Sequence, residues 1–351
     1  MAAKAVDDGR ADGRRGPRRP TMQDVADRVG LSRPLVSIVL RGAPGASDES
    51  RERVLAAARE IGYYPDDSAR MLRLRRSRRL GVLFTMRQPF EADLVDALYA
   101  EAERRGYTLA LSHMGPGRPQ RTALDELMGQ RIEALIVLAA EDEAGTVTQL
   151  PDAIPAVMLG GPRSNGDEHD DVRVENEAGI ALAVSHLTGL GHRDIVYVGP
   201  AEGPNAVERL TGYTAAMAEA GLASHIDVVE SGYTEVGGSR AAQALLARRV
   251  RPTALICAND RCASGVTSML IRAGVAVPEG MSVVGFDDSS AARLPYLDLT
   301  SVRPDPARMA ALAIDAAEAR IECPESSAGP VHHRVPVTLA VRSSTGPAPA
   351  N

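Results

Sequence analysis

Residues 21–42 read TMQDVADRVGLSRPLVSIVLRG, and this stretch decides how the N-terminal part of the chain folds. Thr21 is a good N-cap, and Asp24 stands three residues later, where a carboxylate completes a start that resembles a capping box. The pattern therefore predicts a helix over Met22–Val29. Gly30 comes next and suits the positive φ at which helices commonly end.

Two more short helices are predicted after the first. Ser32 can cap a helix over Arg33–Leu40, whose first turn carries a proline that leaves no hydrogen bond unmade. A third helix begins at Ser47 or Asp48 and runs to Ile61, because apolar residues recur there at helical spacing.

The spacing of three residues indicates how the first two helices pack. Ala26, Gly30 and Val36 lie at intervals of four and six residues. A small residue lets the second helix approach, the glycine makes the turn, and the β-branched residue fills the interface. This is typical of a helix-turn-helix, in which the second helix enters the DNA major groove; a structural helical bundle is the alternative.

Charge favours the DNA-binding interpretation of this head. Residues 1–80 carry 18 Lys and Arg against 11 Asp and Glu, whereas the rest of the chain carries 22 against 35. A basic head on an acidic body is expected when only the head meets a polyanion.

Residues 65–79, PDDSARMLRLRRSRR, follow the predicted helices. The proline and aspartates suit a helix N-terminus, and the six arginines in residues 70–79 suit its other end. The segment is too short and too charged to be a stable helix alone. It is either a solvated linker or a segment that folds on DNA, with Met71 and Leu72 as apolar wedges for the minor groove.

Residues 80–343 alternate between short apolar runs and amphipathic stretches, which predicts βα units and parallel sheets. A TIM barrel, one large sheet and two doubly wound lobes all fit this rhythm. Doubly wound sheets bind ligands at the carboxyl ends of their strands, where Asn259–Asp260 and Asp287–Asp288 stand. The expected strands are Leu80–Thr85, Thr108–Ser112, Ala134–Leu138, Ala156–Leu159, Ile195–Val198, Ala254–Cys257 and Ser282–Gly285. The expected helices include Ala92–Arg105, Ala178–Gly189, Val207–Ala220, Val236–Arg249, Cys262–Ala273 and Pro306–Ile321.

Composition excludes several classes of protein. The chain has 351 residues, 44% apolar and 25% charged, which is ordinary for a globular protein of two or three domains. The longest apolar run, Ala134–Ala140, is too short to cross a membrane, and the N-terminus lacks the apolar segment of a secretory signal. Three cysteines exclude a disulfide scaffold and indicate a cytoplasmic protein. Zinc-site spacing is absent, so no metal or cofactor is expected.

Two rival functions are opposed by the sequence. A solute-binding protein for transport would need no basic helical head. An enzyme on a doubly wound fold is opposed by the absence of G-x-S-x-G, of G-x-x-x-x-G-K-[ST], and of G-x-G-x-x-G after a strand. We therefore expect no enzymatic activity.

Several motifs resemble those of the LacI/GalR (lactose-repressor/galactose-repressor) family of bacterial transcription regulators. The head TMQDVADRVGLSRPLVSIVLRG is similar to its helix-turn-helix, and YYPDDSARMLR is similar to its hinge helix. In the body HLTGLGHRDIVYVG, ERLTGY, PTALICANDRCASGV, VPEGMSVVGFDD and LTSVRP resemble family signatures in the expected order. The resemblance covers about residues 20–345.

The resemblance implies a small all-α helix-turn-helix DNA-binding head and an α/β body. The body would have two doubly wound parallel-sheet lobes, like those of periplasmic binding proteins, with three chain crossings between them. Together with the composition, this predicts a disordered basic tail (1–19), a helix-turn-helix domain (20–64), a hinge helix or linker (65–79), an effector-binding and dimerisation domain (80–345) and a tail (346–351). The N-lobe would take about 80–176 and 303–325, and the C-lobe about 177–302 and 326–345.

The function implied is that of a cytoplasmic, homodimeric repressor. It would bind a roughly palindromic double-stranded DNA operator, under the control of a small-molecule effector, a carbohydrate or related metabolite, in the cleft between the lobes. By resemblance, Arg209 in ERLTGY, Asn259 in CAND and Asp287 in GFDD would contact the effector. Phe90, after the first strand, is a candidate for stacking on it. The alternatives are a surface salt bridge for Arg209, a turn cap for Asp287 and a core position for Phe90.

The DNA contacts implied are spread over the head and the hinge. Arg33 can read guanine or contact phosphate, and the hydroxyls of the head suit phosphate contacts better than base contacts. Leu72 occupies the position of an intercalating leucine. The expected DNA-binding residues are Thr21, Ser32, Arg33, Pro34, Ser37, Ala69, Leu72 and Arg73.

Two positions depart from the family pattern. Gly160 stands after the fourth strand, where some sugar-binding members carry an aspartate. Ile38 stands on the second helix, where many members carry an arginine. The first departure bears on the identity of the effector, and the second on the DNA sequence that is read.

Overall fold

The computed structural model describes residues 20–64, 76–138, 150, 154–161, 169–203, 205–323 and 329–349. The chain divides into two compact units, and the boundary between them along the sequence falls between Arg76 and Ser77. The tail at 1–19 and most of the hinge segment lie outside the described residues, and so do the expected DNA contacts Ala69, Leu72 and Arg73.

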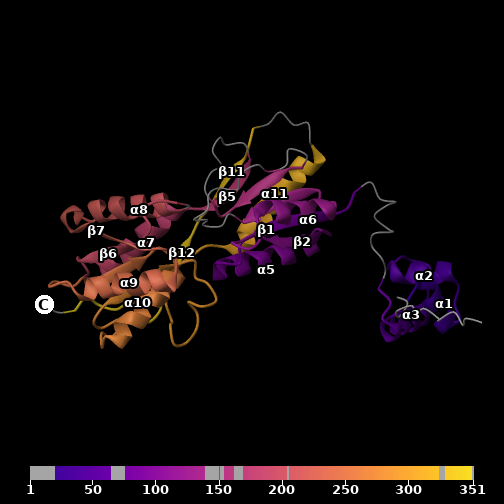
Figure 1. Ribbon diagram of the computed structural model, residues 1–351, viewed down its shortest axis with the longest axis horizontal. Helices are drawn as coiled ribbons and strands as arrows, with labels where there is room; N and C mark the ends of the chain where they lie inside the picture. The colour runs from indigo at the N-terminus through magenta and orange to yellow at the C-terminus, as the bar shows by residue number, and fades with distance from the viewer. Residues whose placement is uncertain are drawn as a thin grey trace, which may run out of the picture. The chain divides into compact units, whose positions relative to one another are not determined.

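The described part of the first unit contains three helices: α1 (Met22–Val29), α2 (Arg33–Leu40) and α3 (Asp48–Ile61) (Figure 1). All three predicted helices are confirmed, because their ends are encoded by local capping. The Thr21 hydroxyl accepts a hydrogen bond from the Asp24 amide, while the Asp24 carboxylate accepts one from the Thr21 amide at 2.6 Å. Such reciprocal caps satisfy amide groups that a helix start otherwise leaves without partners.

The second and third helices begin in the same way. The Ser32 and Ser47 side chains accept hydrogen bonds from the amides of Leu35 and Ser50, three residues along the chain. Gly30 ends α1 at a φ of 66°, the left-handed conformation predicted for it. Glycine adopts this conformation without steric cost, so the chain can turn sharply into α2.

A small apolar core holds the three helices together. Ala26 and Val36 are 1% and 0% exposed, as the spacing predicts for the contact between α1 and α2. Val54 brings α3 into the same cluster. Because the valine side of α2 faces inward, Arg33 and Pro34 at its start are exposed.

The second unit contains two six-stranded sheets, which confirms two doubly wound lobes and excludes both a barrel and a single sheet. The strand order is β11-β5-β4-β3-β1-β2 in the first sheet and β12-β10-β9-β8-β6-β7 in the second. The pairings are parallel, except that β12 is antiparallel to β10. The strands are β1 (Arg79–Phe84), β2 (Thr108–His113), β3 (Ala134–Leu138), β4 (Ala156–Leu159), β5 (Asp170–Val174), β6 (Ile195–Gly199), β7 (Asp227–Glu230), β8 (Ala254–Cys257), β9 (Ser282–Phe286), β10 (Thr300–Arg303), β11 (His332–Val335) and β12 (Thr338–Ala340).

Helices flank both sheets (Figure 1). In the first lobe α11 packs against α5 and the strands β3 to β5; in the second, α7 packs on α8, and α9 on α10. The helices are α5 (Pro89–Arg104), α6 (Gln120–Gly129), α7 (Asn176–Gly189), α8 (Ala206–Glu219), α9 (Glu235–Leu246), α10 (Asp260–Arg272) and α11 (Pro306–Glu322), with a 3₁₀ turn at Ala223–His225. No helix in the described part of the chain is long and apolar enough to cross a membrane.

The chain passes between the lobes three times. It crosses from β5 to α7, from β10 to α11 and from β11 to β12. The last crossing corrects the expected lobe boundary, which placed all of 326–345 in the C-lobe. His332–Val335 instead pairs with Asp171–Val174 at the edge of the first sheet.

Helices α9 and α10 approach one another through glycines. A Cβ on Gly265 of α10 would lie 2.0 Å from the Glu235 carbonyl oxygen, and one on Gly238 of α9 would lie 2.1 Å from the Cys262 carbonyl oxygen. Both neighbours are backbone atoms, so neither can rotate away. The two glycines therefore fix the distance between the helices.

Gly265→Ala is expected to destabilise the protein, because the added methyl group must push α9 and α10 apart. Overpacking of this kind typically costs about 1–3 kcal/mol. Urea unfolding followed by circular dichroism measures it, with Ser268→Ala at an exposed position of α10 as the control. An unfolding midpoint unchanged in both variants would contradict the packing described for these helices.

Candidate functional site

A cleft opens between the two lobes of the second unit. The cavity within it has a volume of about 50 Å³, well below the roughly 300–1,000 Å³ typical of small-molecule sites. The second lobe contributes polar side chains, whereas most of the side chains from the first lobe are apolar. The lining residues are Gln88, Phe90, Glu91, Leu94, Leu138, Leu159, Gly160, Val174, Asn205, Arg209, Asp287, Pro304 and Met309.

Arg209 lies in this cleft and is only 3% exposed. Its Nε donates to the Asn176 side-chain oxygen at 2.9 Å, and a terminal nitrogen donates to the Ala258 carbonyl. The guanidinium also lies 3.7 Å from the centre of the Phe286 ring, a cation–π distance. The alternative of a surface salt bridge is therefore wrong for Arg209, because its charge is buried and held on several sides.

Asp287 is the negative partner of this arginine. Its carboxylate lies 3.6 Å from a terminal nitrogen of Arg209, and its backbone has a φ of 106°. A non-glycine residue at positive φ is strained and persists only where its surroundings hold it. The strain places the Asp287 side chain on the cleft wall, where a carboxylate and a guanidinium together can satisfy the hydroxyl groups of a ligand.

Asn259 is buried and bonds to Gln88, a residue that lines the cleft. Its oxygen caps α10 by accepting from the Cys262 amide at 2.9 Å, and its side-chain nitrogen donates to Gln88 at 3.1 Å and to the Tyr233 carbonyl at 3.2 Å. It does not line the cleft. Since Gln88 belongs to the first lobe, Asn259 joins the two lobes. Asn259 is thus the N-cap of α10.

The wall from the first lobe offers little charge to a ligand. Glu91 accepts from the Thr85 hydroxyl at 2.6 Å and from the Arg87 amide at 2.8 Å, so its carboxylate is engaged by its own loop. Phe90 is half-buried and lines the cleft. Gly160, at a φ of 81°, is fixed by the Asn205 side chain, which donates to its carbonyl at 3.1 Å.

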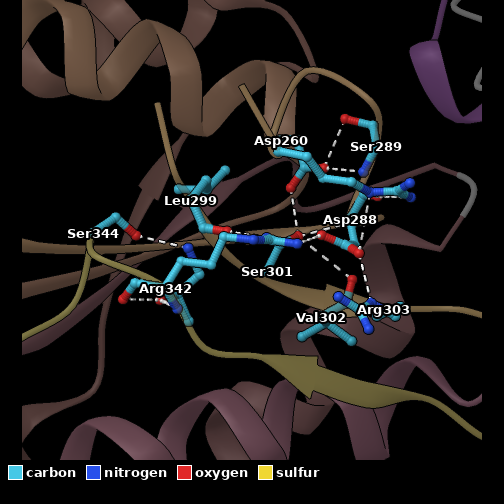
Figure 2. Close-up of polar contacts among 11 residues, drawn as sticks. Asp260, Asp288, Ser289, Leu299, Ser301, Val302, Arg303, Arg342 and Ser344 are labelled. Carbon is cyan, nitrogen blue, oxygen red and sulfur yellow. Dashed lines mark hydrogen bonds and ion pairs between the residues drawn. The ribbon is translucent and has the colours of Figure 1, made fainter. Parts of the chain in front are cut away.

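Asp288 follows Asp287 in the same loop and anchors it; its carboxylate is buried, at 1% exposure (Figure 2). Arg303, at the end of β10, donates to it at 2.6 Å, and Arg342, just after β12, donates at 2.5 Å. Arg303 stands at the end of β10, beside the second crossing, whereas Arg342 belongs to the second lobe. The loop that carries Asp287 is therefore tied to the segment that leads from β10 to the first lobe.

Asp260 completes this anchor from α10 (Figure 2). It accepts from the Ser301 hydroxyl at 2.5 Å and from the amide and hydroxyl of Ser289 at 2.7 and 2.8 Å. Burial raises the pKa of the Asp260 carboxyl to about 7, although these hydrogen bonds oppose the rise. The anchor thus contains one carboxyl that titrates near neutral pH.

Three residues of the site were missed by sequence reasoning. Asn176 and Asn205 hydrogen-bond to one another at 3.1 Å, and Asn176 also donates to Glu208 at 2.8 Å. All three lie close to Arg209, and Glu208 precedes it in the chain. The sequence signal for Glu208 is the motif ERLTGY, in which this glutamate directly precedes Arg209.

In the first unit, the expected DNA contacts lie at helix starts. Ser32, Arg33 and Pro34 are exposed at the start of α2, and Ser37 is half-buried in the next turn. Thr21 is exposed at the start of α1. Exposed hydroxyl and guanidinium groups at a helix N-terminus suit an anionic partner, because the amide groups there carry partial positive charge.

No group of three or more His, Cys, Asp or Glu side chains in the described ranges is arranged to hold a metal ion.

Comparisons with known proteins agree with this division. Residues 21–66 match the model for bacterial regulatory proteins of the lacI family, and residues 184–345 match a periplasmic binding protein-like domain. The HTH-type transcriptional repressor PurR of Erwinia tasmaniensis is 33% identical over 288 residues, covering 80% of this chain and 84% of that protein. The ribose operon repressor of Escherichia coli K12 is 33% identical over 310 residues, covering 87% and 94%.

A solved structure shares the architecture of the chain. The lac repressor dimer bound to operator and the anti-inducer ONPF has a TM-score of 0.69 at 26% identity, over 94% of this chain and all of that one.

Asp260→Asn is expected to flatten the pH dependence of stability. The folded pKa of about 7 lies above the value near 3.9 of an unfolded aspartate, so between these values the folded state holds a proton that the unfolded state has lost. The free energy of unfolding should therefore fall as pH rises from about 4 to about 7, by an amount on the order of 3 kcal/mol from this group.

Urea unfolding across this pH range, for wild type and Asp260→Asn, measures the difference. The asparagine keeps an oxygen for Ser289 and carries no charge, so its curve should lack this fall. Parallel curves for the two proteins would show that Asp260 does not titrate in this window.

Proposed function

The chain belongs to the LacI family of bacterial regulatory proteins and is a DNA-binding repressor controlled by a small-molecule effector, and from this premise we propose how its residues divide that work. The three-helix unit reads an operator, and the cleft of the second unit binds the effector. The protein acts in the cytoplasm as a homodimer and carries no enzymatic activity. Its operator is roughly palindromic, mirroring the two-fold symmetry of the dimer.

The observation that carries this proposal is the buried Arg209 in a cleft between two lobes. The same chain carries a helical head that exposes Arg33 at the start of its second helix. The effector is a carbohydrate or a related metabolite with several hydroxyl groups. Arg209 and Asp287 hold these groups, Phe90 lies against the ring, and Asn259 bears on the site by joining the lobes.

In the head, Arg33 enters the major groove and reads a base or a phosphate, while Thr21, Ser32 and Ser37 bind phosphate oxygens. Pro34, in the first turn of α2, lies at the edge of the groove. In the hinge, Ala69, Leu72 and Arg73 meet the minor groove. An effector that binds differently in the two lobe arrangements shifts their populations, and this changes whether the two heads of the dimer fit the operator.

The direct test of this function is a footprint of the full chain on the DNA upstream of its own gene. A protected region with two symmetric halves is expected. Affinity should fall by roughly 10³-fold or more between about 50 and 200 mM salt, because several arginines displace counterions. Protection of one half only, or binding that salt does not weaken, would contradict it.

Arg209→Ala is expected to abolish effector binding and to leave operator binding intact. A lost charge-assisted hydrogen bond costs about 1.5–3 kcal/mol, which is roughly 10- to 100-fold in affinity. Thermal unfolding in the presence of ribose and other free sugars identifies a ligand for wild type, and calorimetry with that sugar then measures the variant.

Arg240→Ala, an exposed arginine of α9, is the matched control and should bind as wild type does. If a folded Arg209→Ala protein kept wild-type affinity for the sugar, Arg209 would have no part in the site.

Leu72→Ala is expected to weaken specific DNA binding far more than non-specific binding. A leucine inserted between base pairs bends the duplex and gains contacts elsewhere, and alanine is too short to hold that step open. The nearby arginines still bind phosphates, which supply the sequence-independent affinity.

Operator and random-sequence affinities at one salt concentration measure this ratio. Leu74→Ala, two residues along the same segment, is the matched control. An equal drop in both affinities for Leu72→Ala would rule out the wedge.

A further inference from the structure

Glu208 stands between the effector arginine and the first lobe. It lies in the first turn of α8, one residue before Arg209. Its carboxylate lies 3.2 Å from a terminal nitrogen of Arg173 on β5 and 3.2 Å from one of Arg334 on β11. Both arginines belong to the first sheet, so these ion pairs join α8 to the opposite lobe.

The two arginines need this carboxylate. Arg173 and Arg334 are direct partners in the register of β5 and β11, so two positive charges project from neighbouring positions of one sheet. Asp171 accepts from Arg173 Nε at 3.0 Å, but Arg173 is only 6% exposed, and its second terminal nitrogen has no partner among the described residues. Removing a partner from a buried charge is costly, so Glu208 holds this pair of arginines together.

Glu208 also fixes the orientation of the amide that holds Arg209. The Asn176 side chain donates through its nitrogen to Glu208 at 2.8 Å and accepts through its oxygen from Arg209 Nε at 2.9 Å. The oxygen and the nitrogen of an amide are nearly alike in shape and opposite in hydrogen-bonding character. A carboxylate on one side accepts only hydrogen-bond donors, so the amide nitrogen faces Glu208 and the oxygen faces Arg209.

Asn176 lies where the chain enters the second lobe. Asn176 is 1% exposed and is the first residue of α7, where the chain has just crossed from the first lobe. One side chain of α8 therefore contacts a crossing segment, two strands of the first lobe and, through Asn176, the arginine of the cleft.

We propose that Glu208 is the positioning residue of the effector site: it sets the Asn176 amide so that Arg209 points into the cleft, and it joins that arginine to the first lobe through Arg173 and Arg334. This inference rests on the proposed role of Arg209 in effector binding. A shift of the lobes then cannot leave Arg209 unaffected, because the same carboxylate is bonded to the arginines of the first lobe and to Asn176, which holds Arg209.

The experiment uses the full chain and needs no identified ligand. Spin labels at Thr122→Cys on α6 and Ser268→Cys on α10, both exposed, report the distance between the lobes in a Cys323→Ser background. Labelled protein is diluted into an excess of unlabelled protein, so that measured pairs lie within one chain. The Nε–H nuclear magnetic resonance signal of Arg209, assigned with Arg209→Lys, reports its hydrogen bond to Asn176.

Three variants separate the two roles of Glu208. Glu208→Ala should broaden the distance distribution and cause the loss of the protected Arg209 signal. Glu208→Gln keeps an acceptor oxygen for Asn176 and loses the charge, so it should broaden the distances but retain the Arg209 signal. Glu219→Ala, an exposed glutamate at the end of the same helix, should change neither.

Arg334→Gln keeps the inference testable if Glu208→Ala fails to fold. It should broaden the distances less than Glu208→Gln does, because the ion pair of Glu208 with Arg173 remains. The double variant should be no broader than Glu208→Gln alone, since that variant already lacks the ion pair with Arg334. Unchanged distances and an unchanged Arg209 signal in folded Glu208 variants would overturn the proposal. Failure of the proposed function would appear separately, as wild-type protein that does not bind DNA.

Discussion

The buried guanidinium of Arg209 is the constraint on which the arrangement of the site depends. A charge that is 97% removed from solvent must be balanced by polar partners, or it would unfold the region that holds it. Its partners come from three separated segments: Asn176 at a crossing, the Ala258 carbonyl after β8, and Asp287 in a strained loop after β9. Each of these segments is held where it is partly because the arginine requires it.

Buried ion pairs also surround Asp288, the residue after Asp287 in the strained loop. Asp288 accepts from Arg303, which stands beside the second crossing, and from Arg342 of the second lobe. Glu208 and Asn176 act at the first crossing. A carboxylate that is bonded to a cleft loop and to a connecting segment allows a small ligand in the cleft to change the orientation of the lobes. Apolar contacts alone would be less directional, because their energy depends mostly on buried area. The polar network is therefore well suited to convert ligand contact into a change of orientation.

Local physics explains what the sequence could predict. Helix starts at Ser32 and Ser47 depend on bonds spanning three residues, and central strands such as Ala134–Leu138 are continuous apolar runs, so both were predicted at their true bounds. Five strands were missed, because polar or charged residues interrupt their short apolar runs: Asp170–Val174, Asp227–Glu230, Thr300–Arg303, His332–Val335 and Thr338–Ala340. Arg209 and Asp287 came from family resemblance. The roles of Asn259 and Glu208 depend on partners distant in the chain, and no local pattern encodes such contacts.

The central claim is that effector binding in the cleft and operator binding by the head are energetically coupled. Fluorescence anisotropy with labelled operator, with and without a saturating sugar ligand, tests it most directly when paired with calorimetry of the same sugar on free and operator-bound protein. The sugar is expected to change operator affinity by a factor on the order of 5 to 150, and operator should change sugar affinity by the same factor. A sugar that binds through Arg209 and leaves operator affinity unchanged would show that the two sites are not coupled.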